Sequence, residues 1–132
     1  MEKLSRFTFL GGLESLLVRG YRDLPILYRF RESPGVKDPI EMMGIPHTEV
    51  DVILANGCSV GFDYLLKHND TIAVYPPLSR VSTSPVIRLS PAIDLPARFV
   101  LDVHLGSLAR RMRLLGFDPL YRNDFADAAL IR

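Results

Sequence analysis

The sequence has little cysteine, no long apolar run and little net charge. Cys58 is the only cysteine, so the chain cannot form an internal disulfide or a cysteine-built zinc site. Its apolar runs, such as residues 72–75, are far too short to cross a membrane. The first residues do not form the apolar stretch of a signal peptide, so we expect a cytoplasmic protein. A formal net charge of +1 with 23% charged residues argues against disorder and against a general polyanion binder.

What the chain does have is enough apolar material for one sizeable core, or for one small core and part of a second. Hydrophobic residues make up 48% of the 132 residues. Prolines interleaved with serines gather in residues 76–96, a composition typical of an extended connector. We therefore predict a first domain at residues 1–78, a linker at 79–97 and a second segment at 98–132. We expect the first and second parts to form separate cores.

The first part has the pattern of a small α+β domain. Strands are predicted at residues 4–10, 25–30, 50–55, 58–60 and 71–75. Asn56-Gly57 is the strongest hairpin signal in the chain. This order of strands, with one helix between the second and third, indicates a β-grasp fold, in which the helix packs across a mixed sheet.

The predicted helix places Val36, Ile40 and Met43 on one face. If Gly35 caps it, Pro39 removes an early backbone donor, so we expect a distorted or late-starting helix. Gly44 is suited to close it. Six residues have the spacing of inward positions and are predicted to form the core: Phe7, Phe9, Val36, Ile40, Ile53 and Ile72.

The second part reads as strand, helix, strand. Residues 99–101 are suited to a buried parallel strand, a helix should run from about Leu105 to a close at Gly116, and residues 119–122 suit a second strand. Asp102 follows the first strand directly. At the carboxyl end of such a strand, Asp102 could ligate a hard cation such as Mg²⁺ or Mn²⁺, or could simply cap the next helix. The residue pattern leaves both readings open.

Two stretches carry a resemblance to a known family. Residues 36–57 (VKDPIEMMGIPHTEVDVILANG), with residues 70–76 (DTIAVYP), resemble the ubiquitin-like N-terminal domain of bacterial Mut-seven C-terminal proteins. Residues 98–118 (RFVLDVHLGSLARRMRLLGFD) are similar to the opening of the PIN-like ribonuclease domain that follows it in that family. The resemblance implies the fold class: α+β, a ubiquitin-like β-grasp domain followed by an incomplete α/β PIN-like segment. The chain stops at Arg132 without the later acidic motif and zinc-ribbon cysteines that the family leads one to expect, so we expect a truncated domain.

The resemblance also implies a chemistry. It makes Asp102 the first metal-binding acid of a nuclease site that uses Mg²⁺ or Mn²⁺ to cleave RNA. Asp124 and Asp127 could join it as further ligands or could cap a terminal helix. Arg110, Arg111 and Arg113 could hold RNA phosphates, or could be solvated cations near a helix C-terminus. One carboxylate at a strand end, with two more that could instead cap a helix, predicts weak or absent metal binding and no activity in this chain alone.

One other interpretation remains. The β-grasp domain could be a non-catalytic module that binds protein or RNA, with the C-terminal piece vestigial.

The short second segment cannot cover both faces of its strands, so it should expose Phe99, Leu101, Leu108, Met112 and Leu120 and promote docking or self-association. We expect Cys58 to be a half-buried thiol without a catalytic role.

Overall fold

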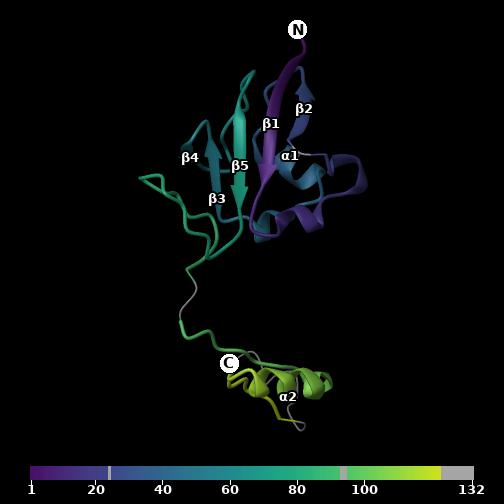
Figure 1. Cartoon of the computed structure of the whole chain (residues 1–132), viewed down its shortest axis with the longest axis vertical. Coiled ribbons are helices and arrows are strands. Elements are labelled where there is room, and N and C mark those ends of the chain that lie inside the picture. The colour runs from purple at the N-terminus through teal and green to yellow at the C-terminus, as the bar shows by residue number, and fades with distance from the viewer. Residues whose placement is uncertain (24, 93–94, 123–132) are drawn as a thin grey trace. The chain divides into compact units, whose positions relative to one another are not determined.

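The computed structural model describes residues 1–23, 25–92 and 95–122. The chain divides into two compact units, Met1–Pro91 and Ala92–Arg132 (Figure 1). No helix in the described part of the chain is long and apolar enough to cross a membrane.

The first unit is a mixed sheet of five strands: β1 Lys3–Phe9, β2 Ile26–Phe30, β3 Val52–Ala55, β4 Cys58–Val60 and β5 Thr71–Tyr75. The strand order is β2-β1-β5-β3-β4, and only β1 and β5 pair in parallel. Helix α1 (Lys37–Met42) lies on one face of this sheet (Figure 1). Short 3-10 helices complete the unit: η1 Leu13–Leu16, η2 Arg19–Tyr21 and η3 His47–Glu49. The β-grasp architecture predicted from the sequence is confirmed.

Local signals explain this topology. Asn56 and Gly57 both have positive φ, at 52° and 83°, which is the primed turn that matches the twist of a two-residue hairpin between β3 and β4. All six predicted core residues are at most 2% exposed and belong to one buried cluster. Alternation in β1 and β5 directs Phe7, Phe9 and Ile72 toward the same core as Ile40 of α1.

Helix α1 begins one residue later than a Gly35 cap would place it. Val36 is the N-cap residue, so Pro39 falls in the first turn, where a helix does not use its backbone N–H groups. The proline is therefore tolerated, and its ring is buried. At the other end, the N–H of Gly44 bonds Glu41 and the N–H of Ile45 bonds Ile40, while Gly44 has a φ of 104°. This pair of bonds is the Schellman closure that glycine favours.

Residues 79–90, predicted as the start of a linker, contact β4 and Asp51, the residue that precedes β3. The Ile87 N–H donates to Ser59 Oγ at 2.8 Å, and the Leu89 N–H donates to the Asp51 carbonyl at 2.8 Å. The Asp51 carboxylate accepts bonds from Arg88 Nη1 at 2.6 Å and from the Ser90 hydroxyl at 2.6 Å. Asp51 is buried, and these bonds hold residues 79–90 against the start of β3. The compact unit accordingly extends to Pro91, although the domain boundaries given above stay predictions.

The second unit is small. Its two expected strands appear as a single parallel bridge between Val100 and Leu120. The Leu101 N–H donates to the Leu120 carbonyl at 3.0 Å, and the Leu120 N–H to the Phe99 carbonyl at 2.8 Å. The 3-10 helix η4 (Val103–Leu105) leads into α2 (Gly106–Leu114), which closes at Gly116 with a φ of 88°. The predicted helix is confirmed, whereas the flanking segments pair over too few residues to form strands.

Two exposure predictions need correction. Leu108 and Leu120 are exposed as predicted, at 43% and 55%, but Leu101 is only 7% exposed. The prediction for Leu101 was wrong because backbone alternation turns Val100 outward and Leu101 inward. Cys58 is exposed rather than half-buried, because it lies in the short edge strand β4 immediately after the hairpin turn.

Candidate metal centre

Asp102 lies where the first paired segment of the second unit ends and η4 begins. Its backbone is extended (φ −61°, ψ 155°), and its carbonyl accepts a bond from the Leu105 N–H at 2.9 Å. It therefore occupies the N-cap position of η4. Its side chain, however, forms no capping hydrogen bond. The position is that of a cap, but the carboxylate does not act as one.

The Asp102 carboxylate is unusual in this chain. Oδ1 is buried and, among the described residues, is the one buried side-chain nitrogen or oxygen without a hydrogen-bond partner. Asp102 as a whole is partly exposed, whereas the two buried acids, Asp51 and Asp70, have both carboxylate oxygens hydrogen-bonded. Asp51 uses both oxygens, and Asp70 accepts bonds from Asn56 on Oδ1 and from Tyr64 on Oδ2. A buried carboxylate oxygen with no donor costs free energy unless a cation or another ligand meets it. Unlike Asp51 and Asp70, Asp102 therefore has a buried oxygen that a hard cation could meet.

The remaining predicted ligands do not complete the site. Asp124 and Asp127 lie outside the described residues. Within the described ranges, no group of three His, Cys, Asp or Glu side chains is close enough to hold a metal ion. The described part of the chain therefore offers Asp102 as a single candidate ligand.

Arg110, Arg111 and Arg113 are exposed on α2. Arg111 and Arg113 lie in its last turn, where the helix dipole favours cations. Arg113 Nη2 also donates to the Pro119 carbonyl at 3.4 Å, so part of its donor capacity is used within the unit. The geometry leaves Arg110 and Arg111 able to meet an anionic ligand.

Tyr121 is a neighbour of the Asp102 turn that the sequence did not indicate. Its hydroxyl donates to the carbonyl of Val103, the residue after Asp102, at 2.9 Å. An added Cβ at Gly106 would approach the Tyr121 oxygen to 2.7 Å. A tyrosine at the end of a predicted strand carries no signal for such a contact, which depends on the pairing of two segments about 20 residues apart.

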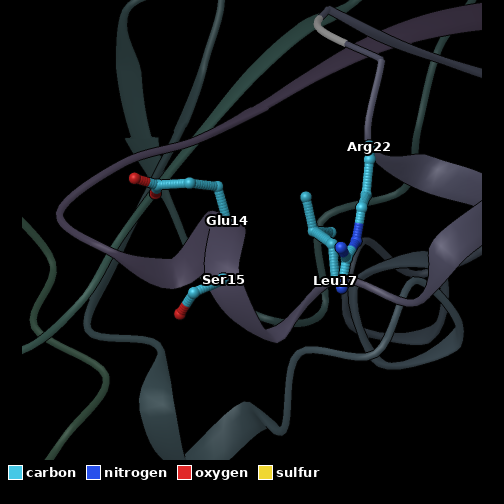
Figure 2. Close-up of a pocket in the computed structure, with 4 residues that line it drawn as sticks. All are labelled: Glu14, Ser15, Leu17 and Arg22. Atoms are coloured by element: carbon cyan, nitrogen blue, oxygen red, sulfur yellow. The ribbon is translucent and has the colours of Figure 1, made fainter.

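A separate hollow of about 400 Å³ lies on the first unit and is lined by Glu14, Ser15, Leu17 and Arg22. Figure 2 shows the Glu14 carboxylate pointing away from Arg22. Glu14 accepts a bond from the Gly12 N–H at 3.1 Å, and the Ser15 hydroxyl donates to the Gly12 carbonyl at 2.7 Å. Both polar groups thus stabilise their own turn. No predicted site residue lines this hollow.

The comparisons with known proteins agree with the division into two units. The family model Mut7-C ubiquitin matches residues 3–82, and the model Mut7-C RNAse domain matches residues 97–132. The first match covers more than half of the chain and includes all five strands, so the chain belongs to the Mut7-C ubiquitin family. The second match contains Asp102 and α2 in a short segment of the RNase domain. No curated protein and no solved structure matches the chain significantly.

Proposed function

We propose that this chain carries the opening of a metal-dependent ribonuclease, preceded by a ubiquitin-like domain that positions RNA or a partner. The observation that supports this most is the buried, unpartnered Oδ1 of Asp102 within the segment that matches the RNase domain. Asp102 is the proposed catalytic residue and first metal ligand. Its position at the end of a parallel-paired segment is where α/β proteins build their sites.

The proposed cation is Mg²⁺ or Mn²⁺, because carboxylate oxygen suits hard divalent ions. When bound, such an ion activates water and neutralises charge on the scissile phosphate. Asp102 would hold one coordination position, with Asp124 and Asp127 as proposed further ligands. A single firmly placed carboxylate leaves the ion most of its water shell, so we propose weak metal binding and no cleavage by this chain alone.

The proposed RNA contact is the arginine-bearing surface of α2. Arg110 and Arg111 are exposed, and planar guanidinium groups can bind phosphates bidentately. Neutralising backbone phosphates in this way makes binding strongly salt-dependent and indifferent to sequence. We further propose a cytoplasmic location, in keeping with the free, exposed thiol of Cys58.

A cleavage assay tests this function. The chain would be extended with the remainder of an RNase domain from the same family and incubated with labelled single-stranded RNA and Mn²⁺. Asp102→Asn keeps the shape of the side chain but removes the charge, so cleavage should be abolished while the fold persists. Asp63→Asn changes an exposed acid of the first unit and is the matched control.

Each outcome of the assay has a consequence. Equal cleavage by the extended wild type and Asp102→Asn would remove Asp102 from the mechanism. RNA binding without cleavage by the extended wild type would favour the alternative, a non-catalytic binding module. Loss of binding at higher salt, and on replacing Arg110 and Arg111, would support the proposed RNA surface.

A further inference from the structure

The Tyr121 side chain forms a hydrogen bond with the turn that carries Asp102. The Tyr121 hydroxyl donates to the Val103 carbonyl at 2.9 Å, in a partly buried position. Val103 follows Asp102 in the chain, and Tyr121 follows Leu120, whose carbonyl accepts the N–H of Leu101 at 3.0 Å. The Tyr121 bond therefore continues the pairing of the two segments one step further, into the Asp102 turn.

Gly106 makes room for this contact. An added Cβ there would lie 2.7 Å from the Tyr121 oxygen, a distance that real Cβ atoms essentially never show, and 3.3 Å from its Cζ, which is a tight contact. Gly106 has ordinary helical angles (φ −58°, ψ −39°), so the backbone does not require glycine for its conformation. What requires it is the phenol, which passes directly over the first residue of α2. The phenol thus bonds the first residue of η4 and lies beside Gly106, the residue that follows η4.

We propose that Tyr121 is a positioning residue for the Asp102 metal ligand. By holding the Val103 carbonyl and packing on Gly106, it fixes η4 and so keeps Asp102 Oδ1 in its buried, unpartnered place. A ligand that is already ordered loses less entropy when it binds a cation, and outer partners of this kind strongly affect metal affinity. This inference rests on the proposed function.

The competing reading is that Tyr121 only stabilises the second unit. Metal affinity and folding distinguish the two roles. The measurement is NMR on the isotope-labelled chain titrated with Mn²⁺, whose paramagnetism broadens nearby backbone amide signals even when binding is weak. Wild type, Tyr121→Phe, Gly106→Ala and Asp102→Asn would be compared.

Tyr64→Phe is the matched control, because it removes a tyrosine hydroxyl that also forms a 2.9 Å bond, to Asp70 in the first unit. In the wild type, broadening should centre on Asp102, and in Asp102→Asn it should vanish. Tyr121→Phe should keep its dispersed signals but need about tenfold more Mn²⁺, the lower end of the loss seen when an outer partner is removed. Tyr64→Phe should titrate as wild type.

Gly106→Ala provides a second test. Alanine favours the helix more than glycine does, yet it displaces the phenol, so helix signals should persist while Mn²⁺ affinity falls. Wild-type affinity in both Tyr121→Phe and Gly106→Ala would overturn the positioning role and leave the proposed function standing. Loss of the dispersed signals of residues 98–122 in both variants would also overturn it, since the role would then be structural. Broadening that is absent in wild type, or that persists in Asp102→Asn, would overturn both proposals.

Discussion

Replacing Asp51 with alanine should destabilise the ubiquitin-like unit by loosening residues 79–90. The carboxylate is 5% exposed and accepts three hydrogen bonds, from Arg88 Nη1, the Ser90 N–H and the Ser90 hydroxyl. Hydrogen bonds to a charged group contribute about 1.5–3 kcal/mol each. Arg88 is 47% exposed, so water can solvate its charge once Asp51 is gone, and no buried cation is left behind. We therefore expect a loss of about 2–4 kcal/mol rather than the sum of three bonds.

The assay is urea unfolding of the whole chain followed by tyrosine fluorescence, because the sequence has no tryptophan. Amide exchange at Leu89 and Ser90 reports on the attachment of this segment, since the Ser90 N–H donates to the Asp51 carboxylate and the Leu89 N–H to the Asp51 backbone carbonyl. The two exchange rates should rise in Asp51→Ala while amides in β1 keep their protection. Asp63→Ala, at an exposed acid, is the control.

The stability that Asp51 contributes should decrease at low pH. Burial raises the pKa of Asp51, but the hydrogen bonds from Ser90 and Arg88 outweigh burial, so its pKa is lowered in the folded chain. A carboxyl with a depressed folded pKa contributes its stability above the unfolded pKa of about 3.9 and loses it as the pH falls through the folded value. The difference in unfolding free energy between wild type and Asp51→Ala should stay constant from about pH 8 to pH 5 and shrink below about pH 4. A loss below about 0.5 kcal/mol, or a difference that grows on acidification, would refute this reasoning.

Two further predictions concern packing. Ile72→Ala should cost about 2–5 kcal/mol in the same urea experiment, because Ile72 is fully buried in β5, and a near-neutral result would contradict the assigned core. Light scattering should show concentration-dependent self-association through residues 98–132, where Leu108 and Leu120 are exposed. Leu120→Glu should reduce that association. A wild type that stays monomeric at high concentration would show that this surface does not mediate self-association.

The fold of the first unit could be predicted because its signals are local. Alternation fixed the inward residues of β1 and β5, and Asn56-Gly57 fixed the hairpin. Pro39 could be tolerated only if the helix started late, and the structure shows why that start is favourable: the first turn has no use for the missing N–H.

Contacts between distant segments could not be predicted. Asp51 meets Arg88 and Ser90 across 37 and 39 residues, and nothing local marks Ser90 as its partner. The sequence does indicate that Asp51 has some partner, because it lies beside an apolar strand and buried charges are normally paired. Likewise, sequence pattern placed Asp102 at a strand end but could not show that its Oδ1 is buried without a donor, because that depends on how the paired segments and η4 pack. The hydrogen bond from Tyr121 to Val103 could not be predicted for the same reason.

Mn²⁺ binding to the chain itself tests directly whether Asp102 is a metal ligand. Free Mn²⁺ gives a six-line electron paramagnetic resonance signal that loses intensity on binding, so a titration counts the bound ion. We expect weak, saturable binding by wild type, displaced by excess Mg²⁺ and lost in Asp102→Asn, while Asp63→Asn binds as wild type. Identical titrations for wild type and Asp102→Asn would contradict it.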